Sequence, residues 1–173
     1  MRPPLVIISL MKRIAAISFN KFRLALFCAI LTIGAVALNF ALAAPADPWT
    51  SVQTVQPAQL VAALQHEKDP HVQVIYVGPR TLYSGGHIPG AVFYGPGSSE
   101  QGIADLKKYA AALAKNSDVV LYCGCCPVEK CPNLRPAFTA LKDTGFARLR
   151  VLILPTSFNS DWVEKGYPVQ KGS

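Results

Sequence analysis

Short apolar runs alternate with amphipathic segments through most of this chain, and that alternation limits the folds available to it. Short apolar runs predict buried strands at 72–77, 118–122 and 149–154, and the first of these runs is rich in β-branched residues. Helical spacing of apolar residues, with proline and glycine at the ends, predicts helices at 56–64, 103–115, 136–144 and 158–165. Strands that alternate with helices pair in parallel. We therefore expect an α/β fold with a central parallel sheet flanked by helices.

Four cysteines lie close together directly after the middle predicted strand. They are Cys123, Cys125, Cys126 and Cys131. Their loop leads from this strand into the helix predicted at 136–144, and ligands bind at such places in open α/β sheets. Loop amides and the positive end of a helix dipole favour negative charge there, which lowers the pKa of a thiol and makes the thiolate available. The loop is therefore the predicted site of sulfur chemistry.

The N-terminal segment, residues 1–43, predicts export. Basic residues precede an apolar run that begins at Leu24, and Ala41-Leu42-Ala43 follows as a small-x-small cleavage pattern. We expect a cleaved signal peptide, a linker at 44–53 and a periplasmic or secreted domain at 54–171. An uncleaved anchor is the alternative, because the apolar run comes close to the length that spans a bilayer. A membrane is an expected partner only in that case.

The net charge of +7 belongs mostly to that segment. Five of the 17 basic residues precede residue 44 and no acidic residue does, so the remainder carries 12 basic and 10 acidic residues, a net charge of +2. This part of the chain has no basic stripe with interleaved aromatic residues. A nucleic acid is therefore not an expected partner.

The clustering of the cysteines argues against a disulfide framework. An exported domain with an even number of cysteines usually forms disulfides, but frameworks that staple a fold spread along the chain. These four lie in one loop, and the mature part is long enough to bury an adequate core without staples. The cysteines are therefore expected to form a site rather than a scaffold.

Three further segments resemble the rhodanese-like domain, a sulfurtransferase family. Gly86-His87-Ile88-Pro89-Gly90-Ala91 is similar to the GHIPGA turn of that family. Val119-Val120-Leu121-Tyr122-Cys123 resembles its strand leading into the active-site cysteine. Trp162 and Gly166-Tyr167-Pro168-Val169 resemble the tail that closes the domain. The resemblance covers most of 54–171 and implies a rhodanese-like α/β fold.

The resemblance also gives the catalytic role to Cys123. Its thiolate would attack a sulfane sulfur donor such as thiosulfate and form a persulfide, which passes its sulfur to a thiophilic acceptor. Arg135 would supply positive charge over the persulfide, and Lys130 and Gly124 would contribute to substrate binding. The expected partners are a small sulfur-containing anion or thiol acceptor and a redox protein, and no cofactor is expected.

The chain departs from the family pattern in three places, one of which is Thr156-Ser157 where a Gly-Gly pair usually precedes the Trp. The Asp-x-Arg pair that usually precedes the turn falls on Tyr76 and Gly78, and Arg80 is near but displaced. The loop after Cys123 is longer than the usual C-x-x-G-x-R. These departures leave open a non-catalytic rhodanese-like module whose loop is redox-active or binds a metal. Phosphatase or arsenate reductase chemistry is disfavoured, because those loops need a compact C-x5-R and the first arginine after Cys123 is Arg135.

Three roles are open for Cys125, Cys126 and Cys131. They can resolve an oxidised or persulfidated Cys123 as a disulfide, form a local disulfide, or bind zinc or copper with it. Adjacent cysteines argue against a tetrahedral site, because neighbouring residues seldom ligate one ion, and the spacing is not that of common zinc modules. We therefore rank redox chemistry ahead of a metal. Cys131 is the preferred disulfide partner, because a ring closed by Cys125 would be strained.

Two residues in the resembling segments are expected to be structural. We expect His87 to hold its turn by hydrogen bonds rather than to act as a base. Trp162 is expected to lie in the core. Neither is included among the candidate site residues.

Overall fold

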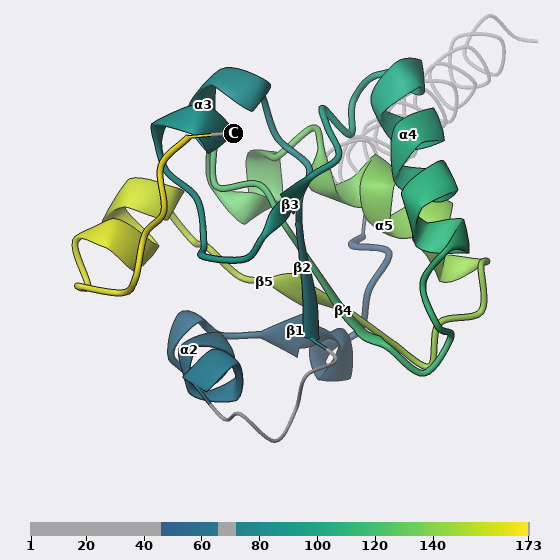
Figure 1. Cartoon of the computed structure of the whole chain (residues 1–173), viewed down its shortest axis with the longest axis horizontal. Coiled ribbons are helices and arrows are strands. Elements are labelled where there is room, and N and C mark those ends of the chain that lie inside the picture. Colours follow the sequence, from purple (N-terminus) through teal and green to yellow (C-terminus); the bar gives the residue numbers. More distant parts are fainter. Residues whose placement is uncertain (1–45, 66–71, 173) are drawn as a thin grey trace, which may run out of the picture. The chain divides into compact units, whose positions relative to one another are not determined.

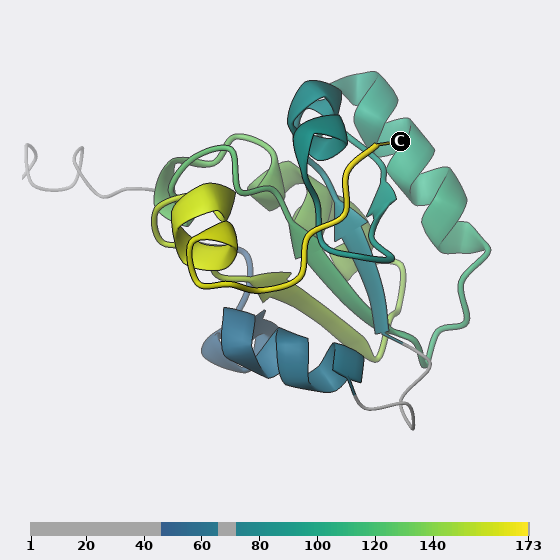
Figure 2. The ribbon, with the colours of Figure 1, turned by 60° about the vertical axis from the view of Figure 1, so that its left-hand side comes forward.

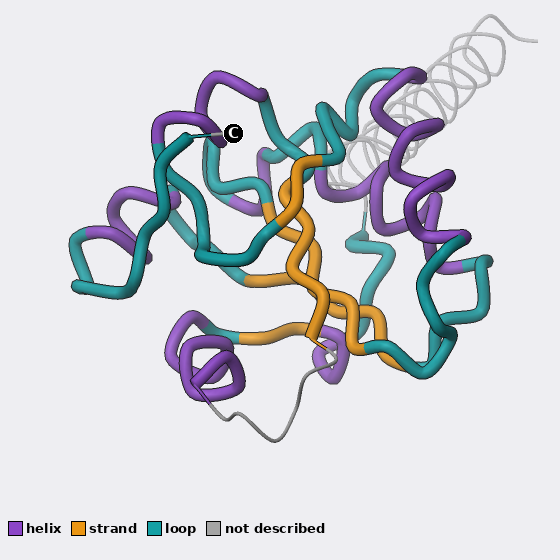
Figure 3. Tube along the Cα trace, viewed as in Figure 1, coloured by secondary structure: helices purple, strands orange, loops and turns teal. Residues whose placement is uncertain are grey.

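The computed structural model describes residues 46–65 and 72–172. These residues form a five-stranded parallel sheet with helices on both faces (Figure 1, Figure 3). The strands are β1 (Thr54–Val55), β2 (Val72–Tyr76), β3 (Val92–Phe93), β4 (Asp118–Tyr122) and β5 (Arg148–Leu152). Their order across the sheet is β1-β5-β4-β2-β3, so β4 is the central strand. The predicted α/β architecture is confirmed.

Helices cover both faces of the sheet. They are α2 (Pro57–Gln65), α3 (Arg80–Gly85), α4 (Glu100–Ala111) and α5 (Leu134–Lys142), with single turns η1 (Ser51–Gln53), η2 (Val128–Lys130) and η3 (Asn159–Val163). One core lies between the sheet and α4 and α5. A second core lies between the sheet and α2, α3 and η3 (Figure 2). Among the described residues, no helix has both the length and the apolar character needed to cross a membrane. The predicted signal segment, 1–43, lies outside these residues.

The alternation along β4 decides where the cysteine loop starts. All five residues of the strand are buried, as the middle of a parallel sheet requires. Val119 and Leu121 belong to the core under α4 and α5, whereas Val120 and Tyr122 belong to the opposite core. Because successive side chains of a strand point to opposite faces of the sheet, the next side chain, Cys123, points to the α5 side, where it is 1% exposed.

Helix α5 forms the far side of the loop. Its apolar residues recur at i, i+3, i+4 and i+7, and all four are buried: Leu134, Ala137, Phe138 and Leu141. The helix begins two residues before the predicted start. Pro136 falls in its first turn, where a missing backbone N–H removes no helical hydrogen bond.

Three features go beyond the sequence-based prediction. Helix α4 begins ahead of residue 103, because the Ser99 hydroxyl accepts a hydrogen bond of 3.0 Å from the Gly102 N–H and caps the helix. Helix α3 is too short to reveal a helical period in the sequence. Trp49 lies in the segment predicted as a linker. It is buried and packs edge-to-face on Phe138, with ring centroids 5.5 Å apart, so this segment contributes to the core.

Candidate active site

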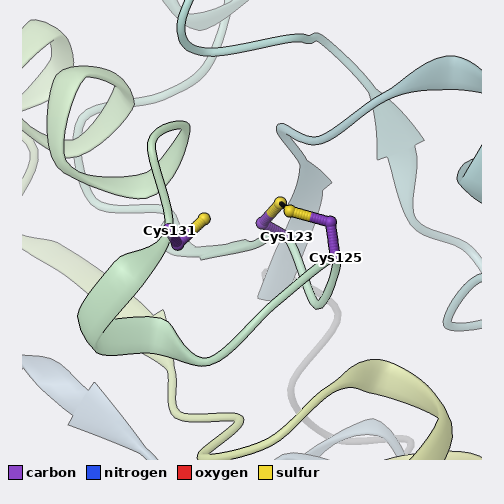
Figure 4. A group of neighbouring side chains, drawn as sticks. All are labelled: Cys123, Cys125 and Cys131. Atoms are coloured by element: carbon purple, nitrogen blue, oxygen red, sulfur yellow. Dashed lines mark hydrogen bonds between the residues drawn. The ribbon is translucent and has the colours of Figure 1, made fainter.

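The cysteine loop brings three sulfur atoms together at the carboxyl end of β4 (Figure 4). The Sγ atoms of Cys123 and Cys125 are 3.1 Å apart, and those of Cys123, Cys125 and Cys131 all lie within 4.8 Å of one another. Cys126 is outside this group, with its Sγ 3.4 Å from that of Cys125. None of these four cysteines forms a disulfide with another described residue. Of the three candidate disulfide partners of Cys123, Cys125 and Cys131 both lie near it, and Cys125 is in direct contact.

Gly124 allows the loop to fold back on itself. Its φ of +72° is in the left-handed region that favours glycine. A Cβ at this position would lie 2.6 Å from the Cβ of Phe158, so a larger residue has no room. The tight turn places the sulfur of Cys125 beside that of Cys123 without a strained side chain at residue 124.

Asn133 orients the cluster from the helix side. Its side chain is buried, and the Nδ2 group donates to Cys123 Sγ at 3.5 Å and to Cys125 Sγ at 3.9 Å. The Oδ1 atom accepts a hydrogen bond of 3.1 Å from the Ser98 N–H. This second bond fixes the amide, so that its N–H groups face the sulfur atoms. Two of the three sulfurs thus share one neutral donor.

Hydrogen bonds place the negative charge of the cluster on Cys131. The Cys123 thiol, followed by the backbone N–H groups of Asn133 and Leu134 at the start of α5, lowers the pKa of Cys131 to about 6. The same interaction with Cys131, together with burial, raises the pKa of Cys123. We expected the helix N-terminus to lower the pKa of Cys123. The helix amides instead reach Cys131, which lies next to the helix in the chain.

Cys126 differs from Cys131 in its ionisation. Burial, followed by a hydrogen bond with Cys125, raises the pKa of Cys126 to about 12. This thiol is therefore protonated at neutral pH. The loop holds a thiolate on Cys131 beside protonated thiols on Cys123 and Cys126.

A cavity of about 450 Å³ gives access to the cluster. Its lining includes Tyr76, Cys123, Gly124, Cys125, Phe158 and Lys171. Lys171, from the C-terminal tail, is the cation among the residues that line it. Its ammonium group gives the cavity a positive charge that suits an anionic ligand.

The hydroxyl of Tyr76 lies beside the Cys123 sulfur. A Cβ on Gly78 would meet the Tyr76 Oη at 2.5 Å and the Cys123 Sγ at 2.8 Å, so both atoms crowd the same point. The hydroxyl is buried and has no hydrogen-bond partner among the described residues. Burial, with a smaller contribution from Cys123, raises the pKa of Tyr76. The group stays protonated and is available as a donor.

Two predicted site residues, Arg135 and Lys130, lie outside the cavity lining. The guanidinium of Arg135 forms a 2.6 Å ion pair with Asp47 and donates to the carbonyls of Val128 and Cys131 at 3.3 and 3.5 Å. Arg135 thus braces the backbone of the cysteine loop. Lys130 is exposed at the end of η2. Their predicted roles toward a substrate stay predictions.

A hydrogen bond holds the turn before β3 against strand β4. The His87 ring stacks on Tyr83 at 3.9 Å between centroids, and its Nδ1 lies 2.9 Å from the Tyr83 carbonyl oxygen. The Ile88 N–H donates to the Tyr122 hydroxyl at 3.0 Å, next to the start of the cysteine loop. His87 therefore holds the turn, as predicted. Trp162 is fully buried and donates to the Pro168 carbonyl at 2.8 Å, which agrees with its predicted place in the core.

Sequence reasoning missed three residues of this site: Tyr76, Asn133 and Lys171. Tyr76 occupies a place where the family pattern differs, and that departure was the available signal. Asn133 was signalled only by its place between Cys131 and a helix start. No pattern pointed to Lys171, because its position depends on the path of the C-terminal tail across the domain.

The comparisons with known proteins agree with this geometry. A comparison with curated protein sequences found no match. Among solved structures, the Alr3790 protein from Anabaena sp. is 22% identical, with a TM-score of 0.51, over 68% of this chain and 82% of that one. The BH2092 protein from Bacillus halodurans is 20% identical, with a TM-score of 0.53, over 68% and 76%.

A third structure carries a functional name. Thiosulfate sulfurtransferase from Pseudomonas aeruginosa is 21% identical, with a TM-score of 0.51, over 75% of this chain and 20% of its own. At such identities the structural matches show a shared fold. The family model of the rhodanese-like domain matches residues 57–159, more than half of the sequence, and spans the turn, the central strand and the cysteine loop. The chain therefore belongs to the rhodanese-like domain family.

Proposed function

We propose that this domain is a sulfurtransferase that moves a sulfane sulfur, from a donor such as thiosulfate to a thiophilic acceptor, through a persulfide on Cys123. The observation that carries the proposal is the position of Cys123. Its sulfur stands at the carboxyl end of the central strand and lines a cavity that also contains a protonated tyrosine hydroxyl and a lysine. Membership of a family named for a sulfurtransferase supports the same assignment.

The first half-reaction forms the persulfide. The Cys123 sulfur attacks the outer sulfur of thiosulfate while its proton passes to the Cys131 thiolate. The S–S bond of thiosulfate breaks, and sulfite leaves with the bonding electron pair. Cys131 acts as the base because the hydrogen bond from the Cys123 thiol, followed by the amides at the start of α5, lowers the pKa of Cys131.

The second half-reaction restores the site. A thiophilic acceptor such as cyanide takes the outer sulfur, and Cys123 keeps the electron pair of the broken S–S bond. Cys131 then returns the proton to Cys123. During the cycle the Tyr76 hydroxyl donates to the persulfide, and Lys171 attracts the anionic donor.

Replacement of Cys123 tests this assignment. The reduced wild-type protein, treated with thiosulfate, should gain the mass of one sulfur atom and release sulfite, and it should form thiocyanate when cyanide is added. Cys123→Ser should do none of these while keeping its circular dichroism spectrum, because a serine oxygen does not hold a sulfane sulfur. Sulfite in place of thiosulfate is the matched control, since it has no sulfur to transfer. If Cys123→Ser formed thiocyanate at the wild-type rate, the nucleophile would have to be another cysteine.

A second function is favoured by the 3.1 Å contact between Cys123 and Cys125. A non-catalytic rhodanese-like module could use this pair, or Cys123 with Cys131, for thiol–disulfide exchange with a redox protein. Peptide mapping after mild oxidation should then find one internal disulfide that a thiol reductant reopens. A protein that forms this disulfide but accepts no sulfur from thiosulfate would favour the redox module over the transferase.

We also propose that the domain is exported. The basis is the predicted signal peptide at residues 1–43. Protein isolated from a native-like host should begin at Ala44 on N-terminal sequencing. Recovery of the chain from membranes with the apolar run from Leu24 intact would show an anchor instead.

A further inference from the structure

We propose that Cys123, Cys125 and Cys131 form a three-coordinate thiolate site for a soft metal ion, and that this ion is Cu(I). Cys123 stands at the end of β4, Cys125 follows it in the loop, and Cys131 lies shortly before α5. Their three Sγ atoms lie within 4.8 Å of one another (Figure 4). Such separations allow one ion to contact all three sulfurs after small side-chain adjustments. The site goes beyond the proposed sulfurtransferase function and does not depend on it.

The number of ligands favours copper over zinc. Within the described part of the chain, the group contains three Cys, His, Asp or Glu side chains and no fourth. The Cys126 sulfur lies 3.4 Å from that of Cys125 and interacts with Cys131, but it does not belong to the group, and neighbouring residues such as Cys125 and Cys126 seldom ligate one ion. The Asn133 oxygen is occupied by the Ser98 N–H. Structural zinc sites are almost always four-coordinate, whereas soft thiolates suit Cu(I).

Burial supports the same choice. Cys123 is 1% exposed and Cys131 is 2% exposed, so two of the three ligands are screened from water. Cys125 is partly exposed and borders the cavity, which provides an entry path for the ion. A zinc ion with three thiolates would need a further ligand such as a water molecule to complete its usual four-coordinate geometry, whereas the group offers three sulfurs.

The surroundings compensate the negative charge of a metal–thiolate centre. The buried Asn133 amide donates to two of the sulfurs, at 3.5 and 3.9 Å, and the backbone N–H groups at the start of α5 reach the third. Donors of this kind orient thiolate ligands and stabilise their charge.

Copper and sulfur transfer compete for the same atom. An ion bound to Cys123 occupies the sulfur that would attack the donor, so a loaded site transfers no sulfur. Metal binding is nevertheless measured without turnover. A protein that fails to transfer sulfur can still confirm the site, and an active sulfurtransferase can still lack it.

The test is an anaerobic Cu(I) titration of the full chain, reduced and stripped of metal, in competition with a coloured Cu(I) chelator. We expect one ion per chain, a thiolate-to-copper charge-transfer band and three sulfur neighbours by X-ray absorption. Cys125→Ser should weaken binding by more than the roughly 10–100-fold typical of losing an outer-shell partner, because it removes a ligand. Cys126→Ser is the matched control, and its affinity should equal that of the wild type.

Several outcomes would overturn the site. One is complete removal of copper by the chelator, and another is equal affinity in the wild type and Cys125→Ser. A centre with four sulfur neighbours, or displacement of Cu(I) by Zn²⁺, would reject the three-coordinate copper assignment. The circular dichroism spectrum of Cys125→Ser shows whether a loss of copper affinity comes from a folding defect. Because Cys125 is only partly buried, a serine at this position should leave the spectrum unchanged.

Discussion

Two tyrosines on neighbouring strands offer a sharp test of how this site is built. Tyr76 on β2 and Tyr122 on β4 are register partners, and both side chains are buried with ring centroids 5.1 Å apart. The Tyr122 hydroxyl accepts a hydrogen bond of 3.0 Å from the Ile88 N–H. The Tyr76 hydroxyl has no partner among the described residues. Replacement of each tyrosine by phenylalanine removes the same single atom from two contrasting environments.

Tyr122→Phe should lower the free energy of unfolding, whereas Tyr76→Phe should leave it unchanged or raise it. Tyr122→Phe leaves a buried N–H without its acceptor, which costs about 1–3 kcal/mol. Tyr76→Phe removes a hydroxyl whose burial already costs about 1–3 kcal/mol in proteins. That variant should be as stable as the wild type or more stable by about 1 kcal/mol. With a urea m-value of about 1–3 kcal/mol/M, a difference of about 2 kcal/mol separates the two midpoints by roughly 1 M.

Equilibrium urea unfolding of the reduced, metal-free proteins measures this difference, with the wild type as the reference. Equal m-values in the three proteins would show that their midpoints can be compared directly. A loss of 1 kcal/mol or more in Tyr76→Phe would refute the reasoning, because its hydroxyl would then have a stabilising partner. An unchanged midpoint in Tyr122→Phe would equally contradict it. Tyr76→Phe should also transfer sulfur more slowly despite its stability, since its hydroxyl lies beside the Cys123 sulfur.

Three further predictions concern charges. The thiolate absorbance of the metal-free protein should rise with a midpoint near pH 6, because the lowered pKa of Cys131 leaves it ionised above that value, and Cys131→Ser should lose this step. Lys171→Met should raise the KM for thiosulfate by roughly 3–10-fold, the effect of losing about 1 kcal/mol from one exposed charge, and should lower kcat by less. An unchanged KM would show that Lys171 does not contribute to the site. Asp118→Ala should lower the free energy of unfolding by about 1.5–3 kcal/mol in a urea titration, because the buried carboxylate accepts two hydrogen bonds from Arg150, at 2.9 and 2.5 Å. A loss below about 1 kcal/mol would contradict this expectation.

The strand and helix pattern was predictable because it depends on local periodicity. The strand predicted at 118–122 matches β4, whose five residues are buried on both faces. The helix predicted at 136–144 overlaps α5, whose buried residues recur at helical spacing. Boundaries were less predictable, because they depend on capping contacts such as the Ser99 hydroxyl before α4. The turn around His87 was likewise identified from a short contiguous motif.

The sequence by itself determined that four cysteines share one loop between a strand and a helix. The tertiary structure alone decided that the sulfurs of Cys123, Cys125 and Cys131 all lie within 4.8 Å of one another, whereas Cys126 is not part of this group. Long-range contacts also decided that Arg135 pairs with Asp47 and that Lys171 borders the cavity. The physical reason is that periodicity reports which face of an element is buried. It does not report the path of an irregular loop or tail, which is set by turns and by hydrogen bonds to groups far away in the chain.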